Sequence, residues 1–313
     1  MQGVRGARAG GRGATSRTPT RRRRRRNITL AVAAVAIALA SGAVAVALVG
    51  SGSSQPQAAP LADQSATTTT VAPTTTTTTA PFPTVPPGTV VTNGPRDRHA
   101  VAITFDSNLT DAMIQELDQH RVASFANVAV IDELDQLQVP ATLFLAGKWI
   151  ERYPDLTRRL AADPLFELGS HSYEHRAYHQ PCYGLGTLPV AQMAADVNRS
   201  EELLHQFTGR PTPYFRFPGG CYDTTALQAT AGTGITVIQY DLASGDAFGT
   251  SVRAIVNNVV TNAQNGSIIV MHITGGNTAP LTAYALPEVV TGLRQKGFSL
   301  VRVSDLLGPP PAP

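Results

Sequence analysis

The sequence predicts an α/β fold whose mostly parallel sheet closes, or nearly closes, into a barrel. Short apolar runs alternate with helix-like stretches between residues 97 and 307, and such alternation is typical of parallel sheets with crossover helices. Seven or eight runs of this kind can be counted, as a barrel requires. Asp, His or Arg follows several of them, and the functional residues of such barrels lie at the carboxyl ends of the strands.

The strands are expected at seven apolar runs. In chain order these are 101–105, 141–145, 166–169, 214–217, 236–240, 267–271 and 299–303. Helical patterns fill the gaps, with apolar residues spaced for one buried face; they include 191–207, 252–263, 286–295 and a stretch through Ile150 and Leu160. No repeat with a period of 20–50 residues is visible, so a solenoid or propeller is not expected.

Three further segments precede the folded unit at 97–307, and a short one follows it. Residues 1–27 form a basic tail, and Ile28 to Val49 is an uncharged apolar run of 22 residues. This run is long enough to cross a membrane as a helix, and arginines on its N-terminal side would keep that side in the cytoplasm. We therefore expect a single-pass anchor with the folded unit outside the cytoplasm. The alternative is a cleaved signal sequence and a secreted protein.

Residues 50–96 are rich in Thr and Pro and nearly free of charge, so we expect a disordered, extended linker. Residues 308–313, which are mostly proline, are expected to be a disordered tail.

The positive charge of the chain comes from its N-terminal tail. The formal net charge is +3, but the first 50 residues contain ten arginines and no acid, which leaves 3 − 10 = −7 for residues 51–313. The folded part is therefore mildly acidic, which argues against a nucleic acid partner.

Two histidines four residues apart, His171 and His175, follow the third strand candidate. On a helix or helical turn this spacing places both imidazoles on one face, where they can bind one metal ion. The alternative is a pair of ordinary surface or core histidines.

The remaining candidates come from other strand ends. Asp106 follows the first strand and is a candidate general base, or else a helix-capping or turn residue. Arg216 lies between two phenylalanines, an unusual place for a surface ion pair, and could hold Asp106 ionised. His272 ends an apolar strand, where a core histidine is the alternative. A carboxylate from Asp246 or Asp241 would raise its pKa and make it a proton donor.

Taken together and in order, these segments resemble the polysaccharide deacetylase family, the NodB-like carbohydrate esterases of family 4. The match rests on 104–106 (Thr-Phe-Asp), 171–175 (His-Ser-Tyr-Glu-His), 216–220 (Arg-Phe-Pro-Gly-Gly), 241–246, and 271–272 (Met-His). Residues 140–145 resemble a further strand of the family. The resemblance covers about residues 99–306 and implies a distorted (β/α)7-type barrel.

The resemblance implies a hydrolase that removes acetyl groups from an N-acetylated or O-acetylated polysaccharide. His171 and His175 would hold a divalent metal, most often zinc, with cobalt or nickel as alternatives. Asp106 would be the base, and Arg216 would orient it. His272, tuned by Asp246, would protonate the leaving group.

Two glycines follow Pro218. The backbone N–H of Gly219 would help to hold the oxyanion. A simple turn at Gly219 and Gly220 is the alternative.

One position departs from the family pattern. The family usually has a second aspartate after the position of Asp106, as a third metal ligand, whereas this chain has Ser107 and then Asn108. Asn108 is the expected substitute, and an uncharged amide should bind the metal more weakly. The alternative function is therefore a catalytically weak or inactive membrane-tethered module that binds glycan. A metal-free glycosidase with paired carboxylates would explain neither the histidine pair nor His272.

The two cysteines, Cys182 and Cys221, fall on loops expected to border the same cleft, and we predict a disulfide between them. The alternative is two separate buried thiols. The expected partner is an extracellular or cell-wall polysaccharide, such as peptidoglycan or another glycan that contains N-acetylglucosamine. The single tryptophan, Trp149, is expected in the core, and the sequence shows no aromatic platform for a sugar.

Overall fold

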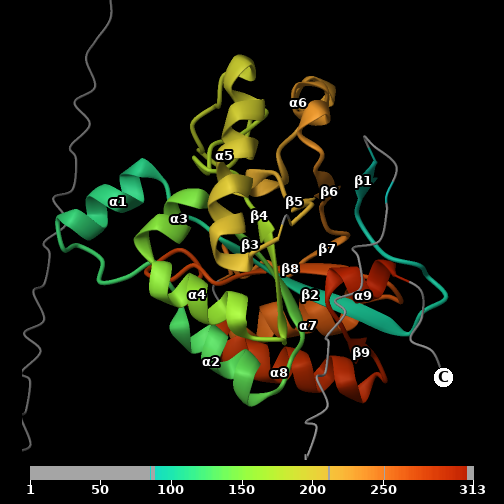
Figure 1. Cartoon of the computed structure of the whole chain (residues 1–313). Helices are drawn as coiled ribbons and strands as arrows, with labels where there is room; N and C mark the ends of the chain where they lie inside the picture. Colours follow the sequence, from blue (N-terminus) through green and yellow to red (C-terminus); the bar gives the residue numbers. More distant parts are fainter. Residues whose placement is uncertain (1–84, 86–88, 211, 250, 309–313) are drawn as a thin grey trace, which may run out of the picture. The chain divides into compact units, whose positions relative to one another are not determined.

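The computed structural model describes residues 85, 89–210, 212–249 and 251–308 (Figure 1). The basic tail, the membrane segment at 28–49 and nearly all of the predicted linker lie outside these residues, as do 309–313. Among the described helices, none combines the length and the apolar character needed to cross a membrane.

The described residues form one nine-stranded sheet in which all strand pairs are parallel. The strands are β1 (Val90–Val91), β2 (Ala100–Ser107), β3 (Ala141–Leu145), β4 (Phe166–Ser170), β5 (Tyr214–Phe215), β6 (Thr236–Ile238), β7 (Leu242–Ala243), β8 (Ile268–His272) and β9 (Ser299–Leu300). All seven predicted strands are present, and β1 and β7 are additional.

The sheet is an open barrel rather than a closed one. Its order is β1-β6-β5-β4-β3-β2-β8-β7, with β9 beside β2, so β1 and β7 stand at opposite ends of the path. The expectation of a closed or nearly closed barrel is corrected in this respect. Strand β1 lies within residues 50–96, which are predicted as a disordered linker. That prediction is corrected at Val90 and Val91, because these residues pair with β6.

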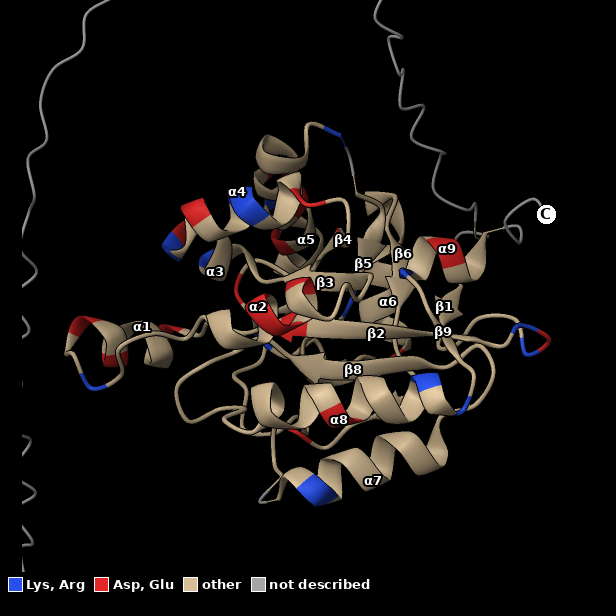
Figure 2. Ribbon diagram, turned by 90° about the horizontal axis from the view of Figure 1, so that it is seen from below, with Lys and Arg blue, Asp and Glu red and all other residues tan. Residues whose placement is uncertain are grey.

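Helices cover the outer face of the sheet on two sides (Figure 2). The helices α2, α7 and α8 pack together beside β8 and β2, whereas α3, α4 and α5 lie beside β3 and β4. The helix bounds are α1 (Asp111–Asp118), α2 (Val128–Gln136), α3 (Gly147–Arg152), α4 (Pro154–Ala162), α5 (Val190–Thr208), α6 (Thr224–Thr230), α7 (Val252–Asn262), α8 (Thr282–Gln295) and α9 (Val303–Leu307).

Local signals fix several helix ends. The side chains of Thr110, Asp223 and Ser251 accept hydrogen bonds from backbone N–H groups three residues on, as N-caps do. The stretch predicted through Ile150 and Leu160 is two helices, because Pro154 begins α4 and restricts the residue before it.

Side chains along each strand alternate between the outer core and the inside of the barrel, because successive strand residues point to opposite faces. On β2, Val101, Ile103 and Phe105 belong to the large core under the helices. Ala102 belongs instead to a smaller inner core with Phe144, Tyr214 and Ile268. Continuing this alternation turns Thr104 and Asp106 inward, and the same period turns Val270 and His272 inward on β8.

Candidate active site

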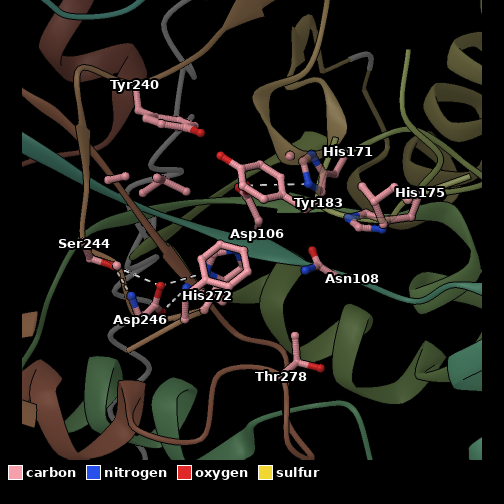
Figure 3. Close-up of a pocket in the computed structure, with 17 residues that line it drawn as sticks. Asp106, Asn108, His171, His175, Tyr183, Tyr240, Ser244, Asp246, His272 and Thr278 are labelled. Atoms are coloured by element: carbon pink, nitrogen blue, oxygen red, sulfur yellow. Dashed lines mark hydrogen bonds and ion pairs between the residues drawn. The ribbon is translucent and has the colours of Figure 1, made fainter. Parts of the chain in front are cut away.

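A cavity of about 340 Å³ opens at the carboxyl ends of the inner strands (Figure 3). It collects seven of the residues that the sequence singles out: Asp106, Asn108, His171, His175, Gly219, Asp246 and His272. Arg216 lies directly behind Asp106, fully buried. Residues that are up to 166 positions apart in the chain, from Asp106 to His272, thus meet at one site.

Arg216 holds Asp106 in place. Its Nη1 donates to Asp106 Oδ1 at 2.8 Å and to Thr104 Oγ1 at 2.8 Å. Its other nitrogens donate to the carbonyls of Ile238 and Gln239. These acceptors fix the orientation of the buried guanidinium. Its bond to Asp106 occupies Oδ1 and leaves Oδ2 for other partners. The surface ion pair considered for Arg216 is therefore excluded.

The two histidines differ in the hydrogen-bond partners of their ring nitrogens. The Nδ1–H of His171 donates to the Arg216 carbonyl at 2.9 Å, which fixes the tautomer and leaves Nε2 as an acceptor 3.6 Å from Asp106 Oδ2. The rings of His171 and His175 lie 5.1 Å apart. Both ring nitrogens of His175 are buried and have no hydrogen-bond partner among the described residues.

The segment that carries these histidines is a bend and not a helical turn, which corrects the geometric reason for expecting them to meet. Ser172 and His175 have positive φ angles of 66° and 50°, so the backbone folds back on itself. Asp196 of α5 supports the bend, because its carboxylate accepts from the N–H groups of Tyr173 and Glu174. The side chain of Ser172 accepts from the N–H of His175.

Burial keeps both imidazoles neutral. Burial lowers the pKa of His171, and the opposing charge of Asp106 does not compensate. Burial and then the neighbouring His171 and His272 hold the pKa of His175 well below its usual value. Neutral imidazoles keep lone pairs, which is the form that binds a metal ion.

A divalent metal fits these residues. The Oδ1 atom of Asn108 is buried without a hydrogen-bond partner among the described residues, as are the ring nitrogens of His175. Ser107 is not a competing ligand, because its Oγ accepts from the N–H of Ala146. Within the described ranges no group of three His, Cys, Asp or Glu side chains is placed to hold a metal, so the candidate set is two imidazoles and one amide oxygen.

At the end of the neighbouring strand β8, His272 is paired with Asp246. The Nδ1 of His272 lies 2.8 Å from Asp246 Oδ1, and its backbone N–H donates to Oδ2 at 2.8 Å. Burial lowers the pKa of His272, but the charge and hydrogen bond of Asp246 outweigh it and the net pKa is raised. Asp241, the other carboxylate considered, instead pairs with Arg96 and accepts from the Ile268 N–H.

The two cysteines form a disulfide, Cys182–Cys221, beside this cavity. It joins the loop after the histidines to a short turn at Pro218–Gly220. Gly219 has a φ of 63°, and a Cβ there would lie 2.7 Å from Cys182 Sγ. This position therefore requires glycine, both for its backbone and for its close contact with the disulfide.

Sequence reasoning missed several supporting residues. Thr282 and Ser244 donate to Asp246, and Thr104 accepts from Arg216. Asp196 had a detectable signal, because it lies three residues after Met193 and therefore on the apolar face of the predicted helix, where an acid is unusual. Two exposed aromatic residues, Tyr183 and Phe248, also line the cavity, and no pattern in the sequence singled them out.

Comparison with known proteins gives a consistent set of relatives. The family model for polysaccharide deacetylase matches residues 93–238. A peptidoglycan-N-acetylglucosamine deacetylase of Bacillus cereus is 26% identical over 226 residues, covering 72% of this chain and 74% of the relative. A chitooligosaccharide deacetylase of Azorhizobium caulinodans is 24% identical over 185 residues, covering 55% of this chain and 83% of the relative.

Solved structures share the fold. A peptidoglycan N-acetylglucosamine deacetylase bound to 4-naphthalen-1-yl-N-oxidanyl-benzamide superposes with a TM-score of 0.59 at 24% identity, covering 70% of this chain and 92% of that chain. A pseudoenzyme of carbohydrate esterase family 4 from Bacillus anthracis gives a TM-score of 0.57 at 18% identity, covering 71% and 69%. A mutant of that pseudoenzyme has restored enzymatic activity and gives a TM-score of 0.58 at 19% identity, covering 71% and 72%.

Proposed function

The chain belongs to the polysaccharide deacetylase family, and from this premise we propose that it hydrolyses the acetamide groups of an N-acetylated glycan. One observation carries the proposal: an arginine-held carboxylate and a carboxylate-held imidazole border the same cavity. A module that only binds glycan has no need of a base and an acid placed together. The products would be acetate and a free amine, or a hydroxyl from an O-acetyl ester.

A divalent metal, zinc in our proposal with cobalt or nickel as alternatives, would be held by His171, His175 and Asn108. When bound, it would act as a Lewis acid that polarises the acetyl carbonyl and makes a water molecule easier to deprotonate. The buried, unpartnered acceptors of His175 and Asn108 support this assignment.

Asp106 would take the proton from the attacking water through Oδ2, the oxygen that Arg216 leaves open. Arg216 would hold that carboxylate in its orientation. His272 would donate a proton to the departing nitrogen, with Asp246 keeping the imidazolium form available. Gly219 lines the cavity, and its backbone N–H would donate to the oxyanion.

The substrate we propose is a polysaccharide that contains N-acetylglucosamine, such as peptidoglycan. The names of the Bacillus cereus and Azorhizobium caulinodans relatives support this class.

We further propose that Ile28 to Val49 anchors the chain in the membrane with the barrel outside the cytoplasm, or directs its secretion if cleaved. The disulfide supports an oxidising compartment.

Acetate release by the purified full-length protein tests the hydrolase proposal. The substrates would be oligomers of N-acetylglucosamine and intact peptidoglycan, with added zinc or cobalt and with chelator. We expect release that requires metal and is lost in His175→Ala. A folded protein that releases no acetate from any of these substrates at saturating metal would contradict the proposal.

The second candidate is a tethered glycan-binding module with little or no catalysis. It is favoured by one observation, the absence of a carboxylate at positions 107 and 108, where Ser107 is bound to the backbone and Asn108 offers only an amide. A related fold from Bacillus anthracis is a pseudoenzyme. Glycan binding without acetate release would select this candidate.

A further inference from the structure

Two aromatic rings stand exposed at the rim of the cavity. Tyr183 and Phe248 are 69% and 71% exposed, their ring centroids lie 5.2 Å apart and their planes are inclined by 32°. Both also line the cavity that contains Asp106 and His272. The five large apolar side chains exposed in the described part of the chain thus include two that touch each other beside the candidate active site.

These rings come from different loops, and both loops are held firmly. Tyr183 directly follows Cys182, whose disulfide ties its loop to Cys221. Its ring packs over Gly219, where an added Cβ would lie 3.2 Å from Tyr183 Cδ2. Figure 3 shows Tyr183 above the Asp106 end of the cavity.

Phe248 lies two residues after Asp246, which accepts hydrogen bonds from Ser244, His272 and Thr282. The backbone N–H of Phe248 donates to the Gly245 carbonyl at 3.2 Å, closing a turn. These contacts anchor the backbone that carries each ring, so less conformational entropy of the loops is lost on binding.

Two exposed rings in contact are more typical of a sugar-binding surface than of packing in a protein core. Exposed aromatic rings in contact leave apolar area in water, which favours a ligand that covers them. A β-linked N-acetylglucosamine ring has an apolar face of C–H groups and a polar edge of hydroxyls, so it can cover an aromatic ring while its hydroxyls stay hydrated. A cavity of about 340 Å³ is at the small end of ligand sites, so neighbouring sugars of a chain must lie on the rim.

We propose that Tyr183 and Phe248 form a stacking platform for the sugar next to the one whose acetyl group enters the cavity. The platform makes the protein prefer oligosaccharides over single sugars. This inference rests on the proposed function, because it takes the substrate to be an N-acetylglucosamine chain.

Calorimetric binding to the full-length protein tests the platform without relying on catalysis. Chelator would be present, and the ligands would be the N-acetylglucosamine tetramer and monomer. We expect Tyr183→Ala and Phe248→Ala each to weaken tetramer binding roughly tenfold and to leave the monomer unchanged. Tyr183→Trp and Phe248→Trp should keep tetramer binding, because they retain an aromatic face.

Tyr284→Ala is the matched control. Tyr284 is also 70% exposed but lies on α8 and does not line the cavity, so its loss should not change binding. Tetramer binding by Tyr183→Ala and Phe248→Ala equal to that of Tyr284→Ala would overturn the platform.

Acetate release with added metal separates the two proposals. If the tetramer KM rises in the platform variants while kcat is kept, both proposals stand. If the wild-type protein releases acetate and the platform variants match Tyr284→Ala, the platform is overturned and the hydrolase remains. If the wild-type protein binds the tetramer through the two rings but releases nothing, the platform stands and hydrolysis is overturned. A wild-type protein that neither binds nor cleaves the tetramer overturns both.

Discussion

Asp106 and His272 are paired in register on the adjacent parallel strands β2 and β8. Each has its own charged partner, since Asp106 is bound by Arg216 and His272 by Asp246. A carboxylate held by a cation and an imidazole held by an anion therefore lie next to each other. Such a pair of differently tuned groups can serve as general base and general acid.

Replacing Asp106 by Asn should lower kcat for acetate release by about 10²- to 10⁴-fold, because the amide cannot accept the proton of the attacking water. The amide oxygen can still accept from Arg216, so the fold should persist, as thermal unfolding would show. Asp155→Asn is the control, since that side chain is 96% exposed on α4. Full activity in Asp106→Asn would remove Asp106 from the role of base.

Replacing Asp246 by Asn should move the alkaline limb of the pH–kcat profile to lower pH. Asp246 is what raises the pKa of His272 against the effect of burial, so its loss deprotonates the imidazole at lower pH. The same raised pKa contributes to stability at low pH, and this contribution is lost as the pH rises through it. An alkaline limb unchanged in the variant would show that His272 is not the proton donor.

Replacing Asn108 by Asp should tighten zinc binding by at least roughly tenfold, because the neutral ligand becomes a carboxylate. Without metal, the buried extra charge should lower the free energy of unfolding, and added zinc should restore it. Competition with a chromophoric chelator measures the affinity. Asn257→Asp, at an exposed position of α7, should change neither quantity, and an unchanged zinc affinity in Asn108→Asp would exclude residue 108 as a ligand.

Replacing Asp196 by Ala should weaken zinc binding by about 10- to 100-fold. Asp196 touches no candidate ligand directly, but it holds the bend between His171 and His175 through two backbone N–H groups and the Tyr178 hydroxyl. Calorimetry with zinc measures the loss. If the affinity stays at the wild-type level, the bend does not depend on this carboxylate.

Reducing the Cys182–Cys221 disulfide should lower the free energy of unfolding by up to about 4 kcal/mol, the entropic value for a loop closed over a separation of 39 residues. Guanidinium unfolding with and without reductant measures this difference. The double variant Cys182→Ser with Cys221→Ser serves as a control, since reductant should not affect it further.

Much of the candidate site can be read from the sequence because strands have a period of two. The inward positions of β2, β8 and the segment after β5 carry Asp106, His272 and Arg216, while their neighbours Phe105, Met271 and Phe215 pack outward. The polar residue at each strand end was therefore visible as an interruption of an apolar run.

Other features were not visible locally. The histidine spacing predicted a helical turn, but the segment is a bend whose positive φ angles are supported from α5, a distant helix. The sequence also left open whether Asp241 or Asp246 is the partner of His272. These two residues flank β7, and the pairing of β7 with β8 is a feature of the tertiary structure.

By itself the sequence determined the α/β class, the seven main strands and the polar residues at their carboxyl ends, because these follow from local periodicity. Tertiary structure alone decided that the barrel stays open, that Arg216 is buried behind Asp106, and that Tyr183 and Phe248 meet. The physical reason is that pairing between distant segments depends on loop paths and packing, which no short stretch of sequence encodes.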